Sequence, residues 1–343
     1  MVKVGLIARA DDRGLGVQTW EWFRHMNPDA TLVVSLGDAA GPFVEHRDRY
    51  PGATWASWAG SGFTDPHLVR SWLEDVDVLY TAETLYDPRM AAWCDAAGVT
   101  AYVHVNPELW RDGRRERASV ATWAPTGWRV GHLPPSTVVM PVPVPTGRWK
   151  VPAPERANDA AVFLHVVGKR ALGDRNGTNL LLAAVQSITV PFRVRLVTQE
   201  QRLPVPRVHP NVHVEIHTGG VEDYWRLYDD ADVVVLPRRY GGLCLPANEA
   251  AGAGLAIVMT DVAPNHRWPI EAVRVAGSPT LLSMPAGQIP AHTADSHDLV
   301  ATLTRMATDT DLRHQRQQQA RQWALEQSWN VWEPEIREAM TCE

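Results

Sequence analysis

The residues with the clearest chemistry lie within 230–261, in a polar loop between two apolar runs. Gly241 and Gly242 occupy the loop, and Pro246 and Glu249 belong to the helical pattern that follows it. Peptide N–H groups of such a loop and of a helix start bind anions, and a first-turn carboxylate accepts hydrogen bonds from two ribose hydroxyls. The pattern predicts a nucleotide site with Glu249 in the first turn. The alternative is that Glu249 only complements the positive end of the helix.

A second polar loop of the same kind comes earlier in the chain. It follows the apolar run 161–167, contains Lys169, Arg170 and Arg175, and leads into a helical pattern at 178–187. Cations at this place would neutralise the charge that builds up on a departing diphosphate. The alternative is a solvated loop with ordinary surface charges.

Two further candidates lie in the first third of the chain. Gly14 and Gly16 follow the apolar run 2–8 and open a helical pattern. They allow a backbone to approach a ligand closely, although a simple tight turn explains them equally well. His104 is near the end of the apolar run 100–105, and a lone histidine at such a place is as often structural as functional.

These loops share one setting, because each connects a short apolar run to a helical pattern. In the first half, runs and helical patterns alternate at 2–8, 17–26, 31–36, 66–74, 76–80, 88–97 and 100–105. In the second half, the strand runs are 161–167, 193–198, 212–217, 233–237 and 256–260, with helices at 178–187, 221–229 and 246–253. This alternation predicts an α/β fold of two Rossmann-like, doubly wound domains. A ligand crevice is expected at the carboxyl ends of the strands, between the domains.

The domain boundary is expected near residue 150. Seven prolines between 133 and 154 oppose both helix and central strand, which indicates an extended connection. We therefore predict domains at 1–150 and 151–325. Residues 326–343 are expected to form a helical tail, for which a return to the first domain is one option.

The segment 230–261 resembles the donor-binding segment of GT-B glycosyltransferases, especially the large retaining family four. That family's pattern is roughly Pro-Ser-x-x-Glu-Gly-Phe-Gly-Leu-Pro-x-x-Glu-Ala, and the matching positions here are Pro237, Gly242, Leu245, Pro246, Glu249 and Ala250. Gly241 replaces the first Glu, while Leu243 and Cys244 stand where Phe and Gly are usual. The resemblance implies that Glu249 binds the ribose of a nucleotide sugar. Because the missing Glu usually contacts the donor sugar, the identity of that sugar is left open.

The resemblance also assigns roles to the other loops. Lys169 or Arg170 takes the family's first basic position, Arg175 lies beside the second, and Gly241, Gly242 and Leu243 line the donor loop. Gly14 and Gly16 are implied to approach the donor diphosphate and acceptor, and His104 to contact the donor sugar. The implied reaction transfers a sugar to an acceptor hydroxyl with retention and without metal. The diphosphate leaves toward the cations and itself takes the acceptor's proton.

No metal or cofactor is expected, since the nucleotide sugar is a substrate. Asp75 and Asp77 copy the Asp-x-Asp of metal-dependent transferases, but they lie at the start of a strand and are typical of a helix-to-strand turn. His213 and His217 are four residues apart on a predicted strand, which places them about 13 Å apart, too far to share an ion.

The acceptor is expected on the first domain, where basic and aromatic residues interleave between 108 and 150. They are Arg111, Arg114, Arg115, Arg117, Arg129, Arg148 and Lys150 with Trp110, Trp123, Trp128 and Trp149. Arginine contacts phosphate, and tryptophan stacks on bases or packs on sugar rings. The alternative is a solvated arginine-rich loop beside core tryptophans.

Net charge favours a glycan or small-molecule acceptor. The formal charge is −6, from 33 basic and 39 acidic residues, so the chain lacks the basic field of a dedicated nucleic-acid binder. We assign acceptor contacts to Trp110, Arg111, Arg114 and Arg115. Hydroxylated bases of DNA are the alternative acceptor, and a non-catalytic nucleotide-sugar binding protein is the alternative function.

Composition points to a cytoplasmic protein without a membrane span. No apolar run approaches the roughly 18 to 20 residues that cross a bilayer, and the start lacks a secretory signal pattern. Cys94, Cys244 and Cys342 are too few and too scattered for a disulfide framework. The sequence indicates no oligomeric state.

Overall fold

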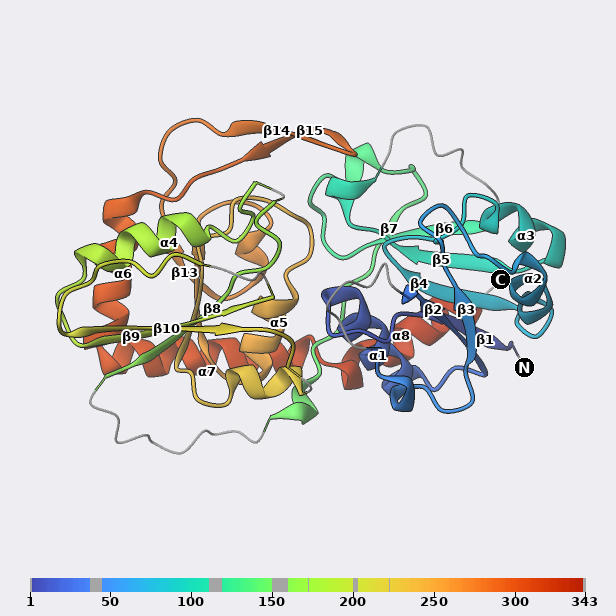
Figure 1. Ribbon diagram of the computed structural model, residues 1–343, viewed down its shortest axis with the longest axis horizontal. Helices are drawn as coiled ribbons and strands as arrows, with labels where there is room; N and C mark the ends of the chain where they lie inside the picture. Colours follow the sequence, from blue (N-terminus) through green and yellow to red (C-terminus); the bar gives the residue numbers. More distant parts are fainter. Residues whose placement is uncertain are drawn as a thin grey trace. The chain divides into compact units, whose positions relative to one another are not determined.

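The computed structural model describes residues 2–37, 45–110, 119–149, 160–171, 173–199, 203–221 and 223–341. The chain forms two compact units, each with its own sheet and core (Figure 1). The first unit is Met1–Val142 with Trp329–Glu343, and the second is Pro143–Ser328. Within the described residues, no helix has the length and apolar character needed to cross a membrane.

The first unit contains a parallel sheet in the order β3-β2-β1-β4-β5-β6-β7. Its strands are β1 (Val4–Ala8), β2 (Ala30–Ser35), β3 (Thr54–Ser57), β4 (Val78–Ala82), β5 (Thr100–His104), β6 (Val120–Ala124) and β7 (Val138–Val139). The helices are α1 (Gly14–Met26), α2 (Pro66–Leu73), α3 (Met90–Ala97) and α8 (Trp329–Thr341). Consecutive residues of a strand face opposite sides. Accordingly, Leu6 packs in the core that holds residues of α1 and α8, and Ile7 packs in the core that holds residues of α2 and α3.

The second unit repeats this plan with a parallel sheet in the order β10-β9-β8-β11-β12-β13. Its strands are β8 (Val162–Val166), β9 (Phe192–Thr198), β10 (Val212–Thr218), β11 (Val233–Leu236), β12 (Ala256–Thr260) and β13 (Ile270–Val273). The helices α4 (Thr178–Ala184) and α6 (Ser296–Thr308) pack on one face, and α5 (Leu245–Gly252) and α7 (Thr310–Glu326) on the other. A separate hairpin joins β14 (Thr280–Met284) to β15 (Gly287–Ala291).

The two α/β sheets confirm the predicted fold class, while several local predictions differ from the structure. The helix expected at 221–229 is only a 3₁₀ helix, η7 (Tyr224–Tyr228). Strands β3, β6 and β13 and the hairpin were not predicted, because segments such as Thr-Trp-Ala-Ser in β3 mix polar and apolar residues without a β-branched run. The proline-rich segment contains the two-residue edge strand β7.

The connection between the units lies a few residues earlier than the expected boundary near 150. Val144 and Trp149 belong to a core of the second unit, and Val144 pairs with Ser328. The chain then returns to the first unit through α8. There the Tyr102 hydroxyl donates to the Ala339 carbonyl at 2.9 Å, and Ile336 is buried.

A buried histidine ties β8 to its neighbours. The His165 ring is fully buried, with Nδ1 2.7 Å from the Val235 carbonyl oxygen and Nε2 2.8 Å from the Thr178 hydroxyl. The carbonyl can only accept, so Nδ1 carries the proton and Nε2 accepts from Thr178. Burial lowers the pKa of His165 from 6.5 to about 4, which keeps the ring neutral in the folded chain.

Folding stability is therefore predicted to fall as the pH drops from 6.5 to about 4. In this window the unfolded chain protonates His165 and the folded chain does not, which costs on the order of 3 kcal/mol. Urea unfolding across the pH range measures the effect. His165→Asn lacks this titration and is expected to give a flatter profile; equal slopes for both proteins would contradict the assignment.

Candidate functional site

Glu249 is buried and accepts a hydrogen bond from the buried Tyr228. Helix α5 begins at Leu245 and has no acidic residue in its first turn, so the prediction that Glu249 lies in that turn is wrong. Favourable interaction with the helix dipole fades beyond the first turn, which weakens the interpretation of Glu249 as a helix-end charge. Its carboxylate instead accepts a hydrogen bond from the Tyr228 hydroxyl. Only 7% of Glu249 is exposed.

The Tyr228 phenol holds this carboxylate in a fixed orientation. Burial, and then the charge of Glu249, raise the pKa of Tyr228 well above its ordinary value, so the hydroxyl stays protonated and donates. The Tyr228 ring meets Trp149 edge to face at a centroid distance of 5.9 Å. A carboxylate has two oxygens with about four lone-pair directions, so one bond to Tyr228 does not exhaust its accepting capacity.

The loop after β11 is built around a buried arginine. Arg238 is 1% exposed, and its guanidinium donates to the carbonyls of Tyr240, at 3.0 Å, and Leu243. In a trans peptide the N–H points away from the carbonyl of the preceding residue. The N–H groups of Gly241 and Cys244 therefore point away from the guanidinium. The loop therefore encloses a positive charge and directs these two peptide donors away from it.

Gly241 is required by the backbone of this loop. Its φ is +116°, a conformation that residues with a Cβ rarely adopt. The glutamate usual at this position in the similar family would be strained here. Arg238 likewise stands where that family has serine, so two departures from the pattern belong to one altered loop.

Arg239 joins this loop to the one after β8. Its backbone N–H donates to the Arg175 carbonyl at 2.9 Å, and its guanidinium donates to the Gly173 carbonyl at 2.6 Å. The loops also touch at Gly177, where a Cβ would lie 2.2 Å from the Pro237 carbonyl oxygen. The two loops form one packed surface at the carboxyl ends of the neighbouring strands β8 and β11.

The predicted cations lie on this joined surface. Lys169 is exposed, and Arg170 and Arg175 are half-buried. The Arg170 guanidinium is 3.5 Å from the Asn179 side-chain oxygen. The Asp174 carboxylate accepts from the N–H groups of Thr178 and Asn179 and caps α4. The structure thus places Lys169, Arg170 and Arg175 at the same end of the sheet as the glycine loop.

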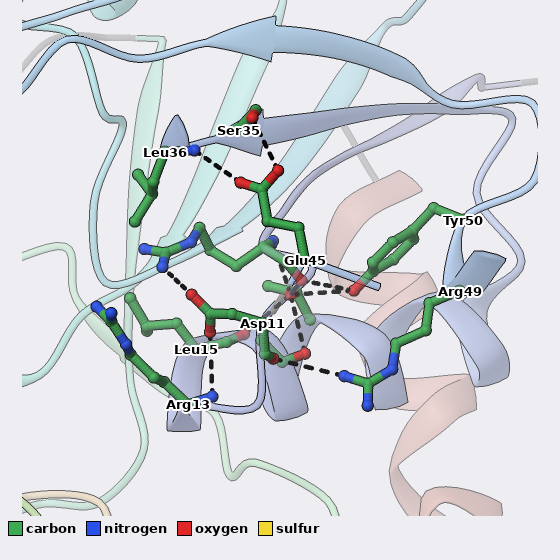
Figure 2. A network of polar contacts seen from close by, with 11 residues as sticks. Asp11, Arg13, Leu15, Ser35, Leu36, Glu45, Arg49 and Tyr50 are labelled. Carbon is green, nitrogen blue, oxygen red and sulfur yellow. Dashed lines mark hydrogen bonds and ion pairs between the residues drawn. The ribbon is translucent and has the colours of Figure 1, made fainter. Parts of the chain in front are cut away.

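In the first unit, the glycine-rich loop opens α1 at Gly14 and is closed by a buried ion pair between Arg9 and Asp11. The Asp11 carboxylate also accepts from the Arg13 N–H at 3.0 Å, as Figure 2 shows. A Cβ on Gly16 would lie 1.9 Å from the Asp11 carbonyl oxygen. Gly16 is therefore needed for close packing of this loop against its own helix.

A neighbouring network secures the ends of β1 and β2. The Glu45 carboxylate accepts from the Ser35 hydroxyl at 2.9 Å and the Leu36 N–H at 2.8 Å (Figure 2). The Tyr50 hydroxyl donates to the Arg9 carbonyl at 3.0 Å. These bonds hold the glycine-rich loop against the strand ends.

His104 ends β5 and is 5% exposed. Its Nδ1 is 3.1 Å from the Tyr80 hydroxyl, which accepts a 2.9 Å hydrogen bond from the Gln18 side-chain amide. Gln18 lies on α1, two residues after Gly16. The structure therefore connects two predicted site features, the glycine-rich loop and His104, through two residues that the sequence did not single out.

The predicted acceptor residues fall into two groups. Arg111, Arg114 and Arg115, with Arg117 and Lys150, lie outside the described residues. Trp110 is half-buried beside the small core of Val105 and Leu133. Trp123 and Trp149 are buried core residues, as expected from the alternative of core tryptophans beside an arginine-rich loop.

The histidines on β10 and the early aspartate Asp77 have structural partners. Nε2 of His213 lies 3.1 Å and Nε2 of His217 lies 3.6 Å from the carboxylate oxygens of Glu215. The Asp77 carboxylate accepts from the Lys3 N–H at 2.7 Å, just before β4. Within the described residues, no group of three or more His, Cys, Asp or Glu gathers as a metal site.

Residues 162–295 match the family described as glycosyl transferases group 1. This match lies within the second unit. The matched residues include Lys169, Arg170, Arg175, Gly241, Gly242 and Glu249, whereas Gly14, Gly16 and His104 lie outside them. No curated protein matches the chain.

Solved structures similar to the whole chain include a glycosyltransferase and a sucrose-phosphate synthase. A glycosyltransferase from Rickettsia africae is 11% identical, with a TM-score of 0.65 and coverage of 100% of this chain and 99% of that one. HepE from Anabaena, in complex with UDP and glucose, is 12% identical, with a TM-score of 0.67 and full coverage of both chains. Sucrose-phosphate synthase from Thermosynechococcus elongatus is 13% identical, with a TM-score of 0.66 and coverage of 99% and 98%. The predicted GT-B fold is confirmed.

Replacing Gly16 by Ala is predicted to destabilise the first unit by roughly 1 to 3 kcal/mol, because the new Cβ meets a backbone carbonyl that cannot rotate away. Chemical denaturation measures the change. Gly127→Ala is the control, since a Cβ there meets nothing within 4 Å. If both variants are as stable as the parent, the close approach to Asp11 is not a constraint.

Proposed function

We propose that the chain transfers a sugar from a nucleotide-sugar donor to a hydroxyl of a glycan or small molecule, and that the second unit holds the nucleotide. The observation that carries the proposal is the pairing of a buried carboxylate, Glu249, with a peptide loop built over the Arg238 guanidinium. One end of this site accepts hydrogen bonds from hydroxyl groups, and the other attracts an anion. A nucleoside diphosphate presents the complementary groups, and a similar structure binds UDP and glucose.

In this proposal Glu249 accepts hydrogen bonds from the ribose hydroxyls. Tyr228 fixes the carboxylate, so little orientational freedom is lost when the nucleotide binds. Hydrogen bonds to an ionised acceptor in a buried setting are about twice as strong as neutral ones. Glu249 is thereby suited to a neutral hydroxylated ligand.

The diphosphate is proposed to lie against the loop containing Gly241, Gly242 and Leu243. Its peptide N–H groups and the buried Arg238 charge are present before the ligand arrives, and such preorganised donors stabilise developing charge without reorganisation. Lys169, Arg170 and Arg175 on the joined loop add positive charge where the diphosphate is proposed to leave. In this scheme these side chains supply the positive charge, and no cofactor or metal has a role.

The chemical step is proposed to proceed with retention of configuration, as in the similar family four. The bond between the sugar and the diphosphate oxygen breaks as the acceptor oxygen approaches from the same face. The leaving oxygen takes the acceptor's proton, so no side chain serves as the base. This scheme leaves Glu249 to bind the ribose hydroxyls.

For the acceptor we propose a carbohydrate or other small molecule near Trp110. Sucrose-phosphate synthase, one of the similar structures, is named for a sugar phosphate product. Hydroxylated bases of DNA gain no support, because Trp123 and Trp149 are buried in cores and offer no surface for stacking.

Glu249→Ala is predicted to weaken binding of the preferred nucleoside diphosphate by about 1 to 3 kcal/mol, or roughly 5- to 150-fold. Tyr228→Phe keeps the carboxylate but releases it, and a loss of about 1 kcal/mol is expected. Calorimetric titration measures both. Glu333→Ala is the control, because Glu333 lies on α8 and pairs with Arg337. Unchanged affinity in both variants would place the nucleotide elsewhere.

Replacing Lys169 and Arg170 together by Ala is predicted to lower kcat more than donor affinity, because leaving-group charge is greatest in the transition state. Turnover of a labelled nucleotide sugar gives kcat, and calorimetry gives the affinity. Arg207→Ala removes an exposed cation of the same unit as a control. A normal kcat in the double variant would remove both residues from the mechanism. Donor binding without turnover by the parent chain would favour a non-catalytic binding protein.

A further inference from the structure

We propose that Gln18 and Tyr80 set the tautomer of His104, so that its neutral ring carries the proton on Nε2. The inference concerns proton positions in a buried chain of three side chains. Its bearing on catalysis rests on the proposed function and on the contact of His104 with the donor sugar that the family resemblance implies, whereas the tautomer itself rests on neither.

The three side chains come from three elements at the same end of the first sheet. Gln18 lies on α1, Tyr80 on β4 and His104 at the end of β5, and their exposures are 5%, 2% and 5%. The Gln18 amide nitrogen is 2.9 Å from the Tyr80 oxygen, which is 3.1 Å from Nδ1 of His104. Strands β4 and β5 are paired, with Ala82 opposite His104.

Counting protons fixes the direction of the chain. The Gln18 amide donates a hydrogen to the Tyr80 oxygen, so the single phenolic hydrogen must find its acceptor elsewhere. Nδ1 of His104 supplies that acceptor only if it carries no proton. In the reverse arrangement the Tyr80 oxygen would receive two hydrogens and its own hydrogen would lose this acceptor. An unmade hydrogen bond in a buried setting costs about 1 to 3 kcal/mol.

The rings around the chain hold this geometry in place. Trp22 stacks on Tyr80 with a centroid distance of 4.7 Å and an interplanar angle of 4°. The His104 ring meets Tyr80 at 82° and Trp123 at 87°. Burial raises the pKa of the Tyr80 phenol above its usual value, so it remains a neutral donor at every working pH.

The consequence is a defined role for His104. With the proton on Nε2, this nitrogen can only donate a hydrogen bond, and it cannot take the acceptor's proton. Gln18 and Tyr80 are positioning residues that act through His104. Because Gln18 follows Gly16 on α1, the packing of the glycine-rich loop also places the first member of the chain.

Nitrogen NMR of the full chain labelled with ¹⁵N-histidine tests the tautomer without reference to activity. His104→Asn identifies the His104 signals among those of the 13 histidines. At neutral pH the parent chain is expected to show an unprotonated Nδ1 and a protonated Nε2. A protonated Nδ1 would mean that the Gln18 amide is turned the other way, and it would overturn the proposal.

Two variants test the positioning residues. Tyr80→Phe removes the donor to Nδ1, and Gln18→Met removes the group that orients the phenol, so both are expected to give His104 signals averaged between tautomers. Tyr102→Phe is the matched control, because it loses a tyrosine hydrogen bond of the same unit but leaves the hydrogen bonds between Gln18, Tyr80 and His104 unchanged. Unchanged His104 signals in Gln18→Met overturn the proposal even if Tyr80→Phe does not fold.

Turnover separates this inference from the proposed function. Roughly tenfold lower kcat/KM for the nucleotide sugar is expected in Gln18→Met, with little change in Tyr102→Phe. If the tautomer shifts while kcat/KM stays constant, the proposal that Gln18 and Tyr80 set the tautomer holds, and the contact of His104 with the donor sugar is wrong. If the tautomer does not shift, the proposal that Gln18 and Tyr80 set the tautomer is wrong, whatever kcat/KM is measured.

Discussion

A guanidinium enclosed by its own loop is the interaction on which the second unit's site depends. Burying the charge of Arg238 costs several kcal/mol unless hydrogen bonds replace water. The carbonyls of Tyr240 and Leu243 supply such bonds, and in turning inward they fix the opposite direction for the following N–H groups. The cost of the buried cation is thus coupled to a loop that is ready for an anion.

The remaining parts of the site are arranged around this loop. Arg239 ties it to the loop after β8, and Gly177 lets the two backbones touch. Glu249 stands one helical turn further along and is held by Tyr228. In the proposed function, the positive loop meets the charged diphosphate and Glu249 meets the neutral ribose. In the first unit, the chain from Gln18 to His104 follows the same principle of a buried polar group held by its partners.

The sequence predicts the fold well because its strands are short, apolar and separated by helical patterns. Segments such as 161–167 and 233–237 are Val- and Leu-rich runs with polar loops after them, and the loops carry the candidate residues. Strands such as β3 and β6 escape prediction because they are stabilised by pairing with neighbours rather than by their own composition. Their places follow only from the assembled sheet.

The details of the site are less visible in the sequence. An arginine in a polar loop is normally exposed, so nothing in the letters around Arg238 indicates its burial. Tyr228 reaches Glu249 across 21 residues, and Gln18 reaches Tyr80 across 62, contacts that depend on tertiary packing. Arg238 and Arg239 are adjacent close to the end of a buried strand. Adjacent side chains at a strand end point in different directions, and this spacing is the one sequence feature that suggests different surroundings for the two arginines.

Hydrogen exchange on the full chain, with and without a saturating nucleoside diphosphate chosen by thermal-shift screening, tests the donor-site assignment most directly. The N–H groups of the loop between β11 and α5, which contains Arg238, and those of α5 are predicted to exchange more slowly when the nucleotide is bound. The N–H groups of the loop after β8 are predicted to do the same. Protection confined to the first unit, or no protection at either loop by any nucleoside diphosphate, would contradict the account.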